Sequence, residues 1–75
     1  MARIELKSEM AGTIAELLVA VGDDVSTGQE LIILESMKME VPVESPSAGR
    51  IAELAVAEGA VVAEDDLLLV IESSS

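Results

Sequence analysis

The sequence predicts an all-β domain, built as a flattened sandwich of two four-stranded antiparallel sheets that pack face to face. Three observations support this fold class. Apolar residues alternate with polar ones in several short segments, five glycines are spread along the chain and interrupt any longer helix, and the second half of the sequence repeats the first. A period of two is the pattern of a half-buried strand.

The repeat appears when the sequence is shifted by 37 residues. Residues 11–36 then align with residues 48–73, and 13 of these 26 positions are identical. Two repeats are too few for a solenoid. We therefore expect two halves of one domain, residues 1–75, related by an internal pseudo-twofold axis.

The elements follow in chain order. Residues 3–7, "RIELK", and 39–44, "MEVPVE", alternate and predict strands. The runs "LIIL" at 31–34 and "LLLVI" at 67–71 are short, rich in aliphatic residues and bounded by turn residues, as in buried strands. "VGDD" and "STGQE" predict turns. Pro42 and Pro46 cannot donate to a ladder, so their strand should lie at an edge or direct these positions away from a neighbour.

We expect eight strands, four in each half, at about residues 2–7, 12–20, 24–26, 30–36, 39–44, 48–57, 61–63 and 67–72. The fourth and fifth should form a hairpin whose tip is Met37–Lys38. Met37 should be exposed. Met39 shares its alternating set with Val41 and Val43, so we expect it to be partly buried.

Composition excludes several functions. The chain has no Cys, His or aromatic residue, which removes disulfides, thiol nucleophiles and serine–histidine catalysis, and we expect no catalytic or metal-binding residue. The formal net charge of −11 disfavours nucleic acid and anionic membranes. No apolar run is long enough to span a bilayer or to form a signal core, which predicts a soluble cytoplasmic protein.

Lys38 is the unusual residue of the chain. A lysine at a hairpin tip ordinarily only improves solvation. This one lies between Met37 and Met39, in the connection between the repeats, and the tip lacks the Gly, Asn or Asp that two-residue turns prefer. Exposed methionines favour a recognition surface. The alternative is that the methionines simply fill the core.

The segment "ESMKME" resembles the attachment motif of biotinyl domains, and the resemblance to the biotinyl/lipoyl attachment family covers nearly the whole chain. It implies a barrel-sandwich hybrid fold and a biotin carboxyl carrier with biotin amide-linked to Lys38. It also implies that Met37, Met39 and Glu35 flank the site as recognition residues. The implied partners are a biotin protein ligase, a biotin carboxylase and a carboxyltransferase, with the isolated domain a monomer.

Other functions remain open at this stage. Lipoyl domains of the same family typically have Asp-Lys-Ala at this hairpin, so the methionines favour biotin over lipoate. An unmodified structural module of the same fold is a further alternative. An acyl carrier protein would be helical and would need Asp-Ser-Leu, which does not occur here. An independent enzyme is disfavoured, because no pair of carboxylates is singled out by its context.

Overall fold

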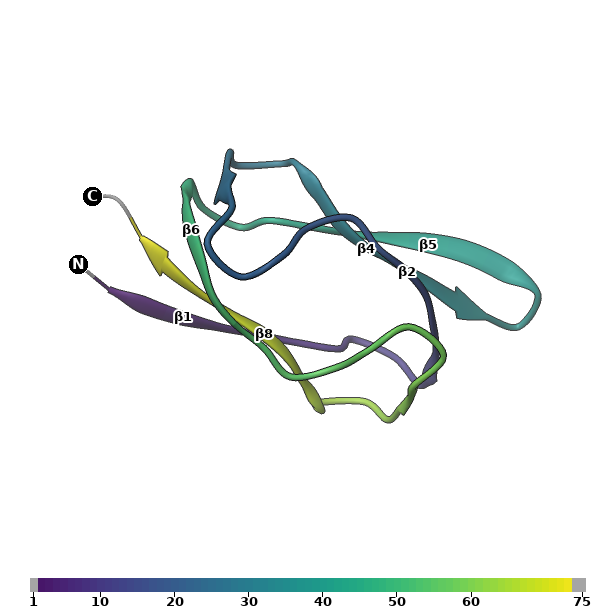
Figure 1. Ribbon diagram of the computed structural model, residues 1–75. Helices are drawn as coiled ribbons and strands as arrows, with labels where there is room; N and C mark the ends of the chain where they lie inside the picture. Colours follow the sequence, from purple (N-terminus) through teal and green to yellow (C-terminus); the bar gives the residue numbers. More distant parts are fainter. Residues whose placement is uncertain (1, 74–75) are drawn as a thin grey trace.

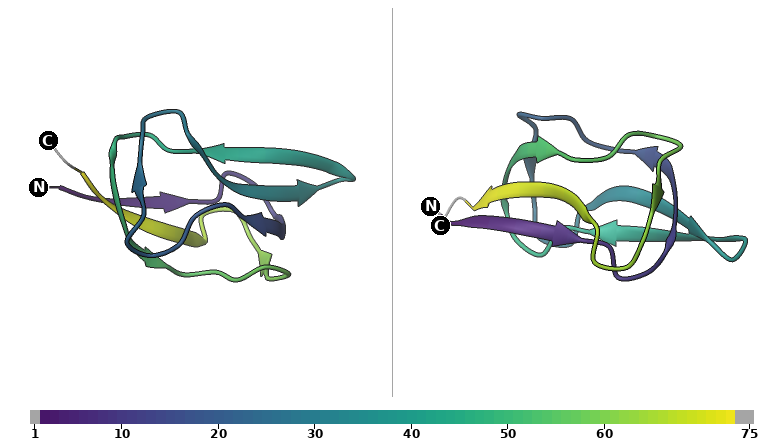
Figure 2. Two further views of the ribbon diagram at one scale, coloured as in Figure 1. Left: turned by 45° about the horizontal axis from the view of Figure 1, so that its top comes forward. Right: turned by 90° about the horizontal axis from the view of Figure 1, so that it is seen from below.

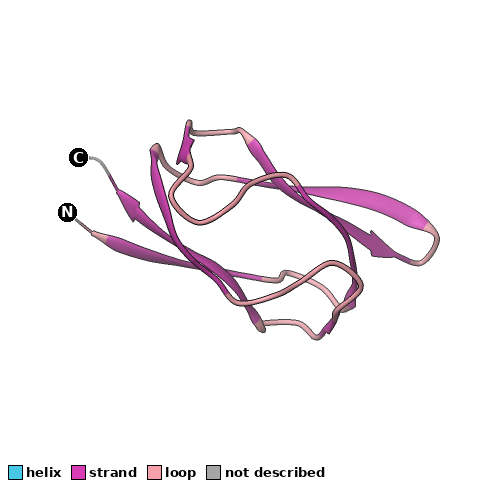
Figure 3. Cartoon of the chain, in the orientation of Figure 1, coloured by secondary structure: helices cyan, strands magenta, loops and turns pink. Residues whose placement is uncertain are grey.

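The computed structural model describes residues 2–73, which form an all-β sandwich and confirm the predicted fold class (Figures 1 and 3). The strands are β1 (Arg3–Lys7), β2 (Gly12–Leu17), β3 (Asp24–Val25), β4 (Glu30–Ser36), β5 (Met39–Glu44), β6 (Gly49–Leu54), β7 (Val61–Val62) and β8 (Leu67–Ser73). Within residues 2–73 there is no helix, and hence none long and apolar enough to cross a membrane.

Each sheet takes strands from both halves of the chain. One sheet has the order β1-β8-β6-β3 and the other β5-β4-β2-β7, and all pairings are antiparallel. A shift of 37 residues converts the first order into the second, which confirms the internal twofold relation. The halves therefore interlock, and the two additional views show the connections passing from sheet to sheet (Figure 2). Neither half has a complete sheet by itself.

The second and sixth strands are shorter than the sequence predicted. β2 ends at Leu17 rather than near residue 20, and β6 ends at Leu54 rather than near residue 57. The reason is topological, because the chain must leave one sheet after each of these strands to reach the other. In the first half, the turn after this strand is closed by the Asp23 amide, which donates to the Ala20 carbonyl at 3.1 Å.

Matching irregularities occur in both halves. The β2–β4 pairing shifts register between Ile14 and Glu16, and the β6–β8 pairing shifts between Ile51 and Glu53, 37 residues later. The halves are also joined directly by backbone hydrogen bonds. The Gly22 amide donates to the Ile51 carbonyl at 2.9 Å, and in the other half the amide of residue 59 donates to the carbonyl of residue 14 at 2.7 Å. The duplicated sequence thus gives duplicated local geometry.

The core is aliphatic and lies between the two sheets. It consists of buried Ile, Leu and Val side chains from both halves: Ile14, Val19, Val25, Leu31, Ile32, Leu34, Ile51, Val62, Leu68, Leu69 and Ile71. Burying one such side chain contributes about 1.5–3 kcal/mol to folding. Outside the core, the predicted alternation holds, since Ile4 and Leu6 of β1 are half-buried between exposed neighbours.

One turn has a glycine in the first half and an aspartate at the equivalent position of the second half. Gly28 has φ 84°, and the equivalent Asp65 has φ 72°. Asp tolerates the left-handed region better than most residues. Each turn is closed by a side chain at its end, where Gln29 Oε1 accepts from the Ser26 amide at 3.0 Å and Asp66 Oδ2 accepts from the residue-63 amide at 2.8 Å. The two turns therefore keep the same form.

Candidate functional site at the hairpin tip

The β4–β5 hairpin projects from the body of the sandwich. Its tip lies at the opposite end of the molecule from the start of β1 and the end of β8 (Figure 1). The molecule is elongated, with principal extents of 36 × 18 × 17 Å. The strands pair from Glu30↔Glu44 to Ser36↔Met39, which leaves Met37 and Lys38 as a two-residue connection and confirms the predicted hairpin.

The turn at the tip is made by two residues in an unfavourable conformation. Met37 has φ 52° and Lys38 has φ 65°. Positive φ at both central residues is the pattern of a type I′ turn, which matches the right-handed twist of the flanking strands. For residues other than Gly, Asn and Asp, the left-handed conformation costs roughly 1–2 kcal/mol each. The fold therefore sustains a strained tip where a Gly-containing turn would be more stable.

The three residues at the tip are open to solvent. Met37 is 91% exposed, Met39 is 65% exposed, and Lys38 is exposed as well. The expectation that Met39 would be partly buried is wrong. Its alternation with Val41 and Val43 is real, and both valines are half-buried. Met39 lies beyond the edge of the sandwich, however, where no facing sheet covers it.

The base of the hairpin is fixed although its tip is exposed. Ser36 Oγ donates to the Ala11 carbonyl at 2.9 Å and so ties the end of β4 to the β1–β2 connection. Leu34, two residues further from the tip, is only 2% exposed and belongs to the core. The burial of Leu34 and the hydrogen bond of Ser36 hold the end of β4 in a defined position. Lys38 therefore extends from a rigid support.

The β4–β5 hairpin has one cation, Lys38, and four glutamates along its strands. Glu35 lies directly opposite Glu40 across the ladder, and both are exposed. The two ion pairs among the described residues are Arg3–Glu53 and Arg50–Asp24, with the second at 3.3 Å. Lys38 is in neither pair. Like charges opposite each other destabilise a sheet, so the carboxylates beside the tip do not stabilise the hairpin.

The structure gathers every site residue that the sequence singled out. They lie together at the end of the β4–β5 hairpin, in the last residues of β4, the two-residue tip and the first residue of β5: Glu35, Met37, Lys38 and Met39. Sequence reasoning missed Ser36 as the anchor. Its signal was available, because it is one of the positions identical in both repeats. It also missed Glu40 as the residue opposite Glu35, which depends on the register of the ladder.

A duplicated β sandwich that presents one exposed lysine on a rigid hairpin defines a class of attachment domains. Comparison with known families agrees with this description. The family model described as "Biotin-requiring enzyme", a biotin/lipoyl model, matches residues 4–71. The chain therefore belongs to the biotin/lipoyl attachment family.

Individual relatives have biotin in their names. The biotin/lipoyl attachment protein of Bacillus subtilis is 51% identical over 35 residues, which is 47% of this chain and 48% of that protein. The biotin carboxyl carrier protein of Streptococcus mutans is 57% identical over 35 residues, covering 47% of this chain and 27% of that protein. The alignments thus span half or less of the length of these relatives.

The fold is also found inside a much larger protein. A single-chain, multi-domain long-chain acyl-CoA carboxylase matches with a TM-score of 0.91 and 34% identity, over 97% of this chain and 7% of that one. The sandwich described above is therefore a fold that occurs as a small part of a carboxylase.

Proposed function

We propose that this chain is a biotin carboxyl carrier domain, with biotin attached through an amide bond to Nζ of Lys38. The observation that carries the proposal is the exposed Met37–Lys38–Met39 tip on the β4–β5 hairpin, in a chain of the biotin/lipoyl family. As part of this proposal, residues 1–75 form one domain, and the protein acts as a carrier rather than as a catalyst.

The geometry suits acylation by a separate enzyme. Amide formation joins Nζ to the carbonyl carbon of an activated biotinyl group and breaks the bond to the activating group, which leaves; Nζ loses one proton before it attacks and a second as the amide forms. Lys38 forms no ion pair among residues 2–73, so we assign the removal of these protons to the ligase. The ligase must supply both the base and the activated acyl group. The chain contributes access, because the hairpin carries Lys38 away from the sandwich (Figure 1).

The residues beside Lys38 are assigned to recognition. Met37 and Met39 expose flexible, polarizable side chains that suit a protein surface with several partners. Glu35 gives the ligase a charged feature at a fixed distance from the lysine, because Ser36 anchors the strand between them. Under the same proposal, the partners are a biotin protein ligase, a biotin carboxylase and a carboxyltransferase in the cytoplasm.

The carrier role follows from tethering. The ureido ring of attached biotin supplies the chemistry of carboxyl transfer. The protein supplies a rigid support and a long arm, so that the ring reaches two separate active sites without being released. A tethered group has an effective concentration in the millimolar range when its linker can span the sites. The elongated shape, 36 Å along its greatest extent, places the tip well away from the rest of the domain.

The assignment of Lys38 is tested with the variant Lys38→Arg, which keeps the positive charge but has no acylatable amine. Wild type co-expressed with a biotin ligase should gain the mass of one biotinyl group and bind streptavidin, and Lys38→Arg should do neither. Lys7→Arg is the matched control and should be modified like wild type. Streptavidin capture of Lys38→Arg would refute the assignment.

The choice between biotin and lipoate is tested by offering both ligases to wild type and to the double variant Met37→Asp/Met39→Ala. If the methionines discriminate, intact mass should show biotin on the wild type and a shift toward lipoate on the double variant. Identical product ratios would show that discrimination lies elsewhere on the surface.

A further inference from the structure

The β4–β5 hairpin is joined to the rest of its sheet on one side only. β5 is an edge strand, so the hairpin is paired to the sheet through β4 and its neighbour β2. The last β2–β4 backbone pair toward the tip is Thr13↔Glu35. The direction in which Lys38 leaves the sandwich therefore depends on what holds the end of β4, at Glu35 and Ser36.

Gly12, the first residue of β2, lies against the backbone at this end of β4. A Cβ atom on Gly12 would be 2.5 Å from the Glu35 carbonyl oxygen and 3.2 Å from the side chain of Leu34. The first distance is shorter than van der Waals contact allows, and the atom in the way belongs to the backbone. Glycine is the residue that lets two backbones approach this closely. Any larger residue would therefore push the end of β4 away from β2.

Ser36 extends this contact beyond the backbone ladder. Its Oγ donates to the Ala11 carbonyl at 2.9 Å, one residue past the last backbone pair of β2 and β4. In the other half of the molecule, the ladder of β6 and β8 continues to the equivalent pair, Gly49↔Ser73. At the end that carries Lys38, a side-chain hydrogen bond thus takes the place of a backbone pair.

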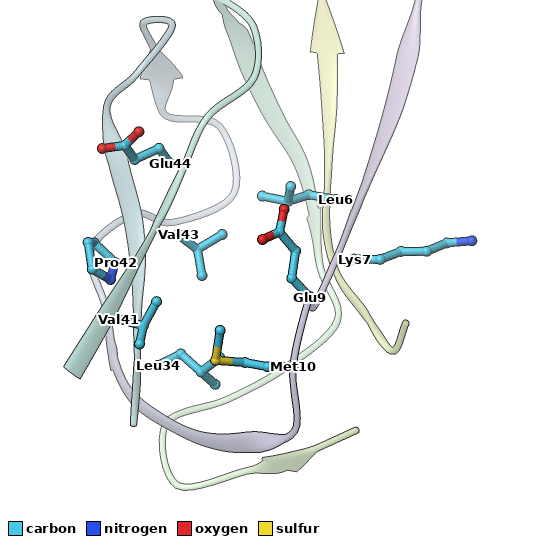
Figure 4. Close-up of a pocket in the computed structure, with 9 residues that line it drawn as sticks. All are labelled: Leu6, Lys7, Glu9, Met10, Leu34, Val41, Pro42, Val43 and Glu44. Atoms are coloured by element: carbon cyan, nitrogen blue, oxygen red, sulfur yellow. The ribbon is translucent and has the colours of Figure 1, made fainter. Parts of the chain in front are cut away.

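Met10 brings the same segment against the hairpin from a second direction. Its side chain packs on the core and lines a groove between the edge strands β1 and β5, together with Leu34 and Val41 of the hairpin (Figure 4). Residues 10–12 therefore contact the base of the hairpin in three ways, through the Met10 side chain, the Ala11 carbonyl and the backbone of Gly12. We call residues 10–12 the hairpin support.

We propose that the hairpin support positions Lys38 for acylation, with Gly12 and Ser36 as positioning residues. The inference rests on the proposed function, because the ligase is the enzyme that needs Nζ at a defined place. Neither residue contacts the acyl group, and both act through the backbone at the end of β4. Lys38 lies beyond the last β2–β4 pair, so a shift of β4 is transmitted to the tip. A misplacement of about 1 Å at a reacting atom can lower a rate by about 10²-fold.

Two glycine variants separate positioning from stability. Gly12→Ala moves the end of β4, and Gly49→Ala produces the same kind of overlap with the Glu72 carbonyl oxygen in the second half. Gly49 pairs with the end of β8, at the opposite end of the molecule from the hairpin tip (Figure 1). With a purified biotin ligase, kcat should fall at least about tenfold for Gly12→Ala and less than about twofold for Gly49→Ala. Partial unfolding lowers only the concentration of competent substrate, which raises the apparent KM and leaves kcat unchanged.

A serine pair gives a milder test, which decides the proposal even if Gly12→Ala fails to fold. Ser36→Ala removes the hydroxyl that reaches the Ala11 carbonyl. The matched control is Ser47→Ala, because Ser47 is also half-buried and its Oγ donates at 3.0 Å to the carbonyl of Ala48, the repeat equivalent of Ala11. The kcat of Ser36→Ala should fall about fivefold. Ser36→Thr keeps the hydroxyl and should be modified at close to the wild-type rate, as should Ser47→Ala.

A second readout does not involve the ligase. In ¹⁵N relaxation of the unmodified protein, the Lys38 amide of Ser36→Ala should show a lower heteronuclear NOE than wild type, and that of Ser47→Ala should not. Wild-type kcat in Ser36→Ala, or an equal loss in Ser47→Ala, would overturn the positioning role while the carrier function stands. Absence of biotin from Lys38 of the wild type would instead refute the proposed function, and the relaxation data would still report whether the hairpin support holds the tip.

Discussion

Met37 is an apolar residue that the fold does not use. At 91% exposure its side chain buries almost no area, and truncation of an exposed residue usually changes stability by less than about 0.5 kcal/mol. Met37→Ala should therefore melt like wild type yet be biotinylated more slowly, as measured by thermal denaturation and by a timed ligase assay. Met10, which packs against the core, provides the contrast, and Met10→Ala should lose about 2 kcal/mol. If Met37→Ala were biotinylated as fast as wild type, this result would contradict a recognition role.

Asp65 is strained in a way that its counterpart Gly28 is not. With φ at 72°, Asp65 occupies a conformation in which glycine has no steric penalty. Asp65→Gly should raise the stability by about 0.5–1 kcal/mol, because the Asp66 side chain still closes the turn. The matched change in the first half, Gly28→Asp, should lower it by a similar amount. Urea denaturation measures both, and a loss of stability in Asp65→Gly would mean that the Asp65 side chain makes a stabilising contribution of its own.

At the scale of the element, the hairpin combines a strained turn with a well-packed base. Leu34 is buried in the core and Ser36 is anchored to the Ala11 carbonyl, so the strands are fixed even though Met37 and Lys38 both have positive φ. The turn conformation is imposed by the strands and not by the residues of the tip. This arrangement keeps Lys38 in place without a glycine at the tip.

The cost of this turn can be measured with Met37→Asn. Asn adopts the left-handed conformation more readily than Met, so the variant should be more stable by about 0.5–1 kcal/mol in urea denaturation. Met39→Asn is the control, since Met39 lies in the strand and is not among the residues with positive φ, and it should give no gain. If Met37→Asn proves less stable than wild type, the tip is not strained as its φ angles indicate.

At the scale of the whole molecule, the fold does not require a bound group. The aliphatic core joins both halves, and the tip at Lys38 contributes nothing to it. Unmodified and biotinylated protein should therefore have melting temperatures within about 1 °C of each other, because an attached group that does not contact the fold adds no stability. Differential scanning calorimetry of the two forms, separated on immobilised avidin, checks this. A rise of several degrees on modification would show that the attached group packs on the domain.

Much of this protein could be read from its sequence because the relevant signals are local. Alternation at residues 3–7 and 39–44 predicts two strands, the 37-residue repeat predicts the twofold relation, and the position of Lys38 between two methionines singles out the site. Each of these depends only on which residues are neighbours along the chain. The left-handed turn at Asp65 also follows from its alignment with Gly28 in the other repeat.

Other features depend on which strands become neighbours in space, and only the tertiary structure decided them. β2 and β6 end early because the chain must cross between sheets, and Met39 is exposed because no facing sheet reaches it. The opposition of Glu35 and Glu40 needs the ladder register, and the groove beside Met10 needs two edge strands from different sheets. Pairing between segments far apart in sequence is set by the packing of the whole core, which no local pattern encodes.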